Sequence, residues 1–394
     1  MASVRKLRPE DPNSPWVCEY TDGGGARRRH TPKTGLKKDA DAFRRRIEGE
    51  LERGEHVAKS QTITVSEGID RWLRHCDRRV RAQDGLRERT LRSYTCNIET
   101  HIRPTIGARR LTDITLRVLQ KWVEDLAFDP KRPRSVHTLT NSVMILGQVL
   151  KFAVVEGHVG KNVLEGREIR IPGRLSAKRE IPTKAVMRDC LAIANAKMQG
   201  GLAPWCRPCL LIAVYGGLRM GEIRALRWEH VDLVSNTIRV RVAADDRGAI
   251  GPPKTAYGVR DVPIAPPLRG ALVEWRDQNN GWRSSDLVLR NHYGRMVQPG
   301  VMLQSWRAVQ HRAIHGKPIG RCRDKHRPGV FRFHDLRHFA ASLFIETGLP
   351  PKRIQEIMGH HSITMTFDLY GHLFDDEKMI AAAMDKMGRD LLAA

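Results

Sequence analysis

The chain is short of acidic residues, cysteines and long apolar runs, and each shortage excludes a class of protein. Its 7 cysteines, an odd number at irregular positions, provide no disulfide framework and favour a reducing cytoplasm over secretion. No run reaches the roughly 18 apolar residues that a membrane span requires, and the N-terminus lacks an apolar signal region. We therefore expect a soluble, cytoplasmic protein without a membrane partner.

The shortage of acidic side chains leaves a strong positive charge. There are 68 Lys and Arg against 44 Asp and Glu, which gives a net charge of +24. The excess lies in residues 1–60, 61–180 and 181–394 alike, so a basic tail on a neutral enzyme does not explain it. A length of 394 residues indicates two or three domains. Together these features predict a nucleic acid held by several domains.

Cys206 and Cys209 form the one cysteine pair with metal-ligand spacing. The pair directly precedes the apolar run 210–214, and no second pair follows it. A buried helix start is therefore favoured over a zinc site.

Residues 1–60 are predicted to form a small DNA-binding module. Residues 16–20 alternate between apolar and polar, glycines follow at 23–25, and a basic segment returns, which is typical of a hairpin. A helix is predicted at 39–53 from its apolar spacing. In the DNA-binding interpretation the contacts include Arg27, Arg28 and Arg29. In the alternative, the module is a structural cap and these arginines are only solvated.

Residues 61–165 are predicted to form an all-helical domain. Helices are expected from Thr64 onward and at 89–102, 115–126 and 135–156. Arg92 and Tyr94 would face a phosphate backbone, although a solvated face is an equally common use of such residues.

Residues 166–180 are rich in Arg, Lys, Gly and Pro and have no apolar period. They are predicted to be a basic interdomain linker that crosses DNA, with Arg174, Lys178 and Arg179 as contacts. Residues 181–394 then begin a new domain, and Thr183 is a suitable cap for a helix reaching 194.

The predicted fold class is mainly α with small β elements, in a multidomain chain. It comprises a small β-sheet-plus-helix N-terminal module, an all-α domain, and a mixed α+β, mostly helical C-terminal domain. Two strand-like runs are expected at 238–242 and 259–264, and a loop that touches DNA or is only mobile at 307–327.

Several polar residues of the C-terminal domain have the chemistry to handle a phosphodiester. Arg219 lies in a turn made by two glycines, where its guanidinium can hold a phosphate through two parallel hydrogen bonds. Glu222, three residues on, can orient it, although an Arg/Glu pair at that spacing is usually a surface ion pair. Lys254 lies at the bend of a predicted hairpin, from which it can donate a proton to a leaving 5′-alkoxide. Most turn lysines do nothing of the kind.

His334, Arg337 and His338 share one predicted helical face, which allows them to address one phosphate. The competing interpretation treats His334 and His338 as a zinc pair. It is disfavoured because the intervening acid is Asp335 rather than the glutamate of the metalloprotease motif, and no third ligand is evident.

Tyr370 precedes a predicted final helix. A phenol with a pKa near 10 is a poor nucleophile at neutral pH unless cations stabilise its anion or a base takes its proton. The surrounding cationic residues and His360 can supply both conditions, whereas a lone helical tyrosine is normally only packing.

Five segments match one family pattern in order. They are Gly217-Leu218-Arg219-Met220-Gly221-Glu222, Pro253-Lys254-Thr255, His334-Asp335-Leu336-Arg337-His338, Met358-Gly359-His360-His361-Ser362 and Tyr370-Gly371-His372. The chain resembles the tyrosine recombinases of the phage-integrase family, strongly over 181–394 and by architecture over 1–180. Met358 replaces a usual Leu, His361 a frequent Ser, and Gly258 a frequent Ser. None of these departures touches a catalytic position of the family.

The resemblance implies a role for each matched residue. Tyr370 would attack a DNA phosphate and form a 3′-phosphotyrosyl link, while Arg219 and Arg337 stabilise the pentavalent transition state. Lys254 would be the general acid, His334 would assist proton transfer, and His360 would bond a non-bridging oxygen. Glu222 would orient its neighbours, and neither metal nor ATP nor another cofactor is implied.

The implied function is site-specific recombination by an integrase of a phage or other mobile element. Residues 1–60 would be an arm-type DNA-binding module, 61–165 the SAM-like core-binding domain and 181–394 the catalytic domain. The partners would be attachment sites in double-stranded DNA and three further copies of the chain, in a bacterial nucleoid. Whether a DNA-bending host factor or a directionality factor is needed stays open, as does docking of the C-terminal helix in cis or in trans.

Two alternative functions remain at this point. A type IB topoisomerase would use the same chemistry without pairing two duplexes, and the basic front module argues against it. A DNA-binding regulator that has lost catalysis is disfavoured by the complete set of catalytic residue types.

Overall fold

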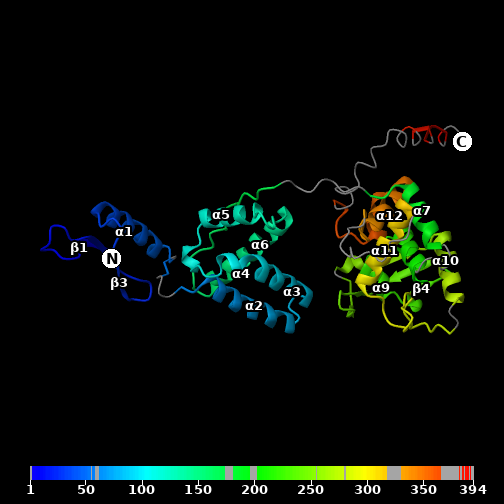
Figure 1. Cartoon of the computed structure of the whole chain (residues 1–394), viewed down its shortest axis with the longest axis horizontal. Coiled ribbons are helices and arrows are strands. Elements are labelled where there is room, and N and C mark those ends of the chain that lie inside the picture. The colour runs from blue at the N-terminus through cyan, green and yellow to red at the C-terminus, as the bar shows by residue number, and fades with distance from the viewer. Residues whose placement is uncertain are drawn as a thin grey trace. The chain divides into compact units, whose positions relative to one another are not determined.

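The computed structural model divides into two compact units, Met1–Ala177 and Lys178–Ala394 (Figure 1). The structure describes the whole chain except residues 1, 55, 58–61, 174–180, 196–201, 254, 279–280, 317–329, 365–380, 382–383, 386, 390 and 392–394. Lys254 and Tyr370, together with Arg174, Lys178 and Arg179, therefore lie outside the described residues.

The first unit begins with a small antiparallel sheet in the order β1-β2-β3. Its strands are β1 (Ser3–Lys6), β2 (Trp16–Thr21) and β3 (Arg27–His30), and helix α1 (Lys37–Glu52) follows. The β2–β3 pair confirms the predicted hairpin, to which the structure adds β1. Helix α1 buries Ala40 and Ile47 and packs mainly against β2.

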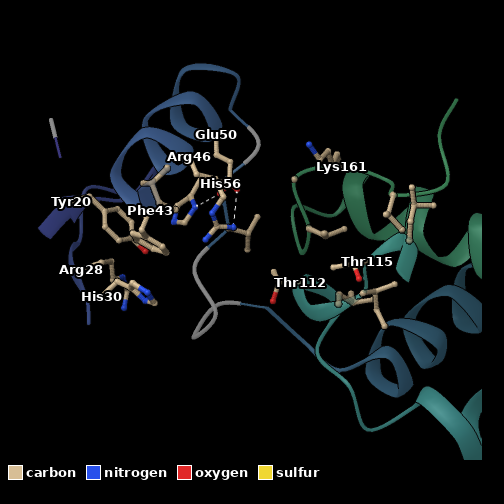
Figure 2. Close-up of a pocket in the computed structure, with 18 of the residues that line it drawn as sticks. Tyr20, Arg28, His30, Phe43, Arg46, Glu50, His56, Thr112, Thr115 and Lys161 are labelled. Atoms are coloured by element: carbon tan, nitrogen blue, oxygen red, sulfur yellow. Dashed lines mark hydrogen bonds and ion pairs between the residues drawn. The ribbon is translucent and has the colours of Figure 1, made fainter. Parts of the chain in front are cut away.

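The two faces of this sheet differ in chemistry. On the face that α1 covers, the ring centroid of Phe43 lies 6.1 Å from that of Tyr20 and 3.7 Å from that of His30 (Figure 2). The alternation of side chains along a strand turns Glu19 and Arg29 to the opposite face, where the Arg29 Nε donates to Glu19 Oε1 at 3.0 Å. This second face, called the open face below, is polar and basic at Glu19 and Arg29, although Val17 on the same face is buried.

The rest of the first unit is helical, as predicted. Its elements are α2 (Val65–Arg81), α3 (Glu88–Asn97), a π-helical turn (Ile98–Ile102), α4 (Arg103–Ile106), a 3-10 turn (Leu111–Asp113), α5 (Leu116–Ala127) and α6 (Val136–Val155). Helix α2 starts with a capping box, in which the Thr64 side chain accepts from the Glu67 amide at 3.2 Å while the Thr64 amide donates to the Glu67 carboxylate at 2.7 Å.

Helix α6 is the core helix of this unit. By its length and composition this helix could cross a membrane, and it is the one such helix among the described residues. It instead buries seven residues in the helical core, among them Leu139, Leu146 and Leu150. Ile169 and Ile171 of the predicted linker pack against the same core, so the linker's first part is held on this unit.

The second unit surrounds α8 (Cys206–Gly216), nine of whose residues are buried. The other helices are α7 (Lys184–Asn195), α9 (Met220–Ala225), α10 (Pro266–Asp277), α11 (Pro299–His315), α12 (Asp335–Glu346) and α13 (Pro351–Met358), with 3-10 turns at Trp228–His230 and Ala256–Gly258. Strands β4 (Val231–Asp232), β5 (Thr237–Val240) and β8 (Arg260–Pro263) form one sheet, and β6 (Ala243–Ala244) pairs with β7 (Ile250–Gly251).

The cysteines Cys206 and Cys209 start α8 and are buried, as the sequence predicted. Burial raises the pKa of the Cys206 thiol to about 12, which leaves it protonated. No group of three or more potential metal ligands occurs among the described residues.

The predicted loop 307–327 is wrong in its first part, because α11 continues to His315. Met302, Trp306 and Val309 recur at helical spacing and are buried, but the Arg and His residues that follow at 311–315 concealed the continuation of this period. Gln310 is buried too, and its side-chain amide exchanges hydrogen bonds of 2.9 and 2.8 Å with the backbone of Phe331. This anchors the segment that leads to His334.

Candidate active site

Arg219 is placed by a tight turn between α8 and α9. Gly217 ends α8 in the left-handed region with a φ of +60°, and a Cβ there would lie 2.8 Å from the sulfur of Met358. Only glycine meets both demands. Arg219 follows as the N-cap of α9, with its side chain 39% exposed.

Glu222 is buried beside Arg219 and does not form a surface pair. Its side chain is 2% exposed. The carboxylate accepts from the Arg219 amide at 2.9 Å and from the Arg219 Nη1 at 2.9 Å. The ordinary interpretation of an i,i+3 ion pair, a solvated surface contact, is therefore wrong here, and the predicted orienting role stays open.

Arg260 completes this network and was missed in the sequence. It lies at the start of β8 and donates to the two oxygens of Glu222 at 3.0 and 2.9 Å. The available signal was its position in the alternation 260, 262, 264, which turns Arg260 inward beside the buried Val262 and Ile264. A charged residue on the buried face of a strand requires a partner, and Glu222 was the candidate.

Arg337 is buried on α12 at 3% exposure, consistent with the shared face predicted for it and His334. Its guanidinium donates to the carbonyl oxygens of Gly217 and Met358. It therefore joins the turn before Arg219 to the C-terminal end of α13, two segments more than a hundred residues apart.

His360 follows a second left-handed glycine, Gly359, which ends α13 at a φ of +63°. The His360 amide donates to the Gln355 carbonyl at 3.1 Å, and the Gln355 Nε2 donates to the His360 carbonyl at 3.2 Å. The Arg219 Nη2 donates to the Gly359 carbonyl at 3.0 Å. The structure thus brings Arg219, Arg337 and His360 together.

The immediate neighbours of Lys254 also reach this region. A Cβ on Gly359 would lie 2.8 Å from the Tyr257 carbonyl oxygen, so the segment after the lysine packs against the turn before His360. A Cβ on Gly258 would lie 2.3 Å from that of Pro253. This close approach explains why glycine stands where the family often has serine.

Two descriptions of known families match the chain. The phage integrase family matches residues 183–377, and the N-terminal SAM-like domain of phage integrases matches residues 64–127. The chain belongs to the phage integrase family of tyrosine recombinases. As a member, it is an enzyme that breaks and rejoins DNA strands.

Relatives and solved structures agree with this family. A XerC-like tyrosine recombinase of Caldanaerobacter subterraneus subsp. tengcongensis is 23% identical over 366 residues, covering 87% of each protein. The structure of the Tn1549 transposon integrase with transposon right end DNA has a TM-score of 0.64 at 18% identity, covering 83% of this chain and 100% of that one. The lambda integrase tetramer bound to a Holliday junction has a TM-score of 0.56 at 18% identity, covering 91% and 98%. The predicted fold class is confirmed.

The two histidines of the candidate site, His334 and His360, are neutral at physiological pH. Burial, reinforced by the charges of the neighbouring His338 and Arg337, lowers the pKa of His334 to about 4. Burial and the charges of Arg337 and Arg219 lower the pKa of His360 to about 3. The same two arginines act on both imidazoles, so the four side chains form one electrostatic unit.

The predicted DNA contacts in the first unit have different surroundings. Arg29 lies on the open face of the sheet, whereas the Arg28 Nε donates to the buried Asp22 at 2.8 Å. Tyr94 is half-buried and packs 5.4 Å from the ring of Trp72. Arg28 and Tyr94 thus also have contacts within the protein. Arg27, Arg28, Arg29, Arg92 and Tyr94 all stay predicted DNA contacts.

The depressed histidine pKa values predict a pH dependence of stability. Each folded-state pKa lies below the unfolded value near 6.5, so the unfolded chain binds protons first as the pH falls. The contribution of the two neutral imidazoles to the free energy of unfolding is complete above about pH 6.5. It is lost as the pH falls to about 4 for His334 and to about 3 for His360. A histidine NMR titration without DNA should show both imidazoles neutral at pH 6, and protonation near pH 6.5 would contradict the burial argument.

Proposed function

We propose that this recombinase is a site-specific integrase whose nucleophile is Tyr370. The tyrosine oxygen attacks a DNA phosphorus and forms a 3′-phosphotyrosyl bond as the bond from phosphorus to the 5′ oxygen breaks. Lys254 gives a proton to that leaving oxygen. The bond energy is kept in the covalent link, so rejoining by the reverse attack needs no ATP.

One observation carries this proposal. The Arg337 guanidinium donates to the carbonyls of Gly217 and Met358, and the guanidinium of Arg219, which follows the Gly217 turn, donates to the Gly359 carbonyl. Both guanidinium groups, from segments far apart in the chain, are therefore fixed where these two turns meet. Fixed guanidinium groups stabilise charge that develops in a transition state, because they require no reorganisation when the reaction occurs. Arg219 still has 39% of its side chain exposed and so has donors for a phosphate.

The neutral state of the two histidines suits the two roles not yet assigned, proton transfer from the phenol and a hydrogen bond to the phosphate. In the proposed reaction His334 assists transfer of the phenol proton, and His360 donates to a non-bridging oxygen. A histidine protonated throughout could not accept a proton, and burial between arginines prevents that state in the free enzyme. The negative charge of an incoming phosphate raises both pKa values toward the working range.

The assembly proposed for strand exchange is a homotetramer on two duplexes at attachment sites. The supporting likeness is to the lambda integrase tetramer bound to a Holliday junction. Residues 61–165 would clamp the duplex as the core-binding domain, and the linker 166–180 would cross it with Arg174, Lys178 and Arg179. A DNA-bending host factor and a directionality factor would act at the same sites, within the nucleoid of the host.

The module 1–60 would bind separate arm sites through the open face of its sheet. Arg5 and Arg29 flank Glu19 on that face, and the strand alternation places Arg27 there too. Contacts from such a face would add phosphate neutralisation without changing the chemistry.

Replacing Tyr370 tests the nucleophile. The full chain would be incubated with a nicked duplex carrying a site that it selects from a random-sequence library, and covalent adducts that survive detergent would be measured. Tyr370→Phe should bind the duplex normally and give no adduct, because the attacking oxygen is lost. Tyr293→Phe, at an exposed tyrosine, is the matched control and should react like the wild type.

Other outcomes of this experiment separate the rival functions. An adduct that persists in Tyr370→Phe would overturn the assignment, and loss of the wild-type adduct with a chelator would revive a zinc mechanism. Binding without any adduct would indicate a regulator. Relaxation of supercoils without exchange between two duplexes would indicate a topoisomerase.

Substitutions in β3 test the DNA-binding role of the module. Arg27→Gln and Arg29→Gln should each lower the affinity for arm DNA and reduce the slope of log affinity against log salt by about 1, because one phosphate contact is lost. Arg46→Gln, on α1 rather than on the open face, should leave the slope unchanged. Arg28→Gln should act mainly through lost stability of the turn at Asp22. Equal salt slopes in all four variants would contradict the open-face interpretation.

A further inference from the structure

Arg260 has more partners than a structural ion pair requires. It is 8% exposed at the start of β8, and every nitrogen of its guanidinium donates a hydrogen bond. Two of these bonds go to Glu222, one to the Ile357 carbonyl at 2.6 Å and one to the Gly258 carbonyl at 3.0 Å. Its partners therefore belong to three separate segments of the active site.

The carboxylate of Glu222 is shared evenly between two arginines. Oε1 accepts from the Arg219 Nη1 at 2.9 Å and from the Arg260 Nη1 at 3.0 Å. Oε2 accepts from the Arg219 amide at 2.9 Å and from the Arg260 Nη2 at 2.9 Å. Arg260 thus fixes the plane of the carboxylate, and that plane fixes the direction of the Arg219 guanidinium.

The third contact reaches the turn that carries His360. A Cβ on Gly359 would lie 3.0 Å from the Arg260 Cδ and 3.2 Å from its Nε. The Nε bond to Ile357 holds the last turn of α13 against β8. The Gly258 bond holds the segment that follows Lys254.

We propose that Arg260 is a positioning residue for strand cleavage, which orients Arg219 through Glu222 and holds the His360 turn and the lysine segment against each other. This inference rests on the proposed function for its catalytic consequence. Arg260 itself is too deeply covered to touch the scissile phosphate. Its effect belongs in the rate of cleavage rather than in DNA affinity.

A merely structural pair would behave differently when Arg260 is removed. Burial acts to raise the pKa of Glu222, but the hydrogen bonds and charge of Arg260, with the charge of Arg219, outweigh it, and the pKa is lowered overall. In Arg260→Met the carboxylate loses its larger partner, so its pKa should rise, because Arg219 alone then opposes the effect of burial. A protonated Glu222 holds Arg219 poorly, so the loss of cleavage rate in Arg260→Met should diminish as the pH rises.

The charged groups around Glu222 do not obscure this readout. Arg219 and Arg260 face it from the start of α9 and from β8, and both stay charged throughout. On the α13 side, His360 has a pKa of about 3 and is neutral at physiological pH.

The experiment measures the single-turnover rate of adduct formation by the full chain on the selected nicked duplex. Arg260→Met should lower the rate on the order of ten- to a hundredfold, as removal of the outer partners of active-site ligands commonly does. Duplex affinity should be nearly unchanged. Arg260→Lys keeps the positive charge but lacks the planar guanidinium that donates to both oxygens. Its rate should lie between those of the wild type and Arg260→Met. The matched control is Arg239→Met, which removes a more exposed arginine paired with Asp232 in the same sheet.

The pH profile supplies the decisive comparison. The ratio of the Arg260→Met rate to the wild-type rate should increase with rising pH as Glu222 ionises. The dependence should vanish when Glu222→Gln is added. Cleavage by Arg260→Met at the wild-type rate would overturn the proposal. So would a lowered rate that is explained by the fraction of unfolded protein and whose ratio to the wild-type rate does not change with pH.

A second readout needs no cleavage and separates this proposal from the proposed function. Amide hydrogen exchange at Arg219 and His360 should accelerate in Arg260→Met and not in Arg239→Met, because both amides depend on the clamped segments. Unchanged protection would overturn the positioning role even if the wild type forms no adduct. Absence of a wild-type adduct would count against the proposed function alone.

Discussion

The candidate active site depends on one buried carboxylate, that of Glu222, and on the two arginines that share it. A carboxylate removed from water must be fully paired, and removing one partner of a buried pair costs about 3–5 kcal/mol. Arg219 and Arg260 satisfy both oxygens with four hydrogen bonds. This requirement links a helix start, a strand and a helix end into one unit, although they are distant in the sequence.

The two left-handed glycines make that link geometrically feasible. Gly217 lets α8 end against the sulfur of Met358, and Gly359 lets α13 end against Arg260. Arg337 then binds a carbonyl at each turn. Cationic side chains are thereby concentrated in a small volume before any phosphate arrives, which is the preorganisation that electrostatic catalysis requires.

The motif residues could be predicted from the sequence because each occupies a short local pattern. The sequence could not reveal Arg260, whose meaning comes from a partner 38 residues away. For Glu222 it left an ordinary surface pair as the alternative to the predicted orienting role, since burial is a property of tertiary packing and not of i,i+3 spacing. The helix up to His315 was missed because its apolar period is interrupted by charged side chains that remain exposed or half-buried. The fold class could be predicted from apolar periodicity, whereas the hydrogen-bond partners of the site residues could not.

The most direct test of this account is a double-mutant cycle between Arg219 and Arg260. The rate of adduct formation would be measured for Arg219→Lys, for Arg260→Met and for the double variant. If Arg260 acts through the orientation of Arg219, the double variant should be little slower than Arg219→Lys alone. Rate effects that multiply independently would show that Arg260 does not position Arg219, and would contradict the account.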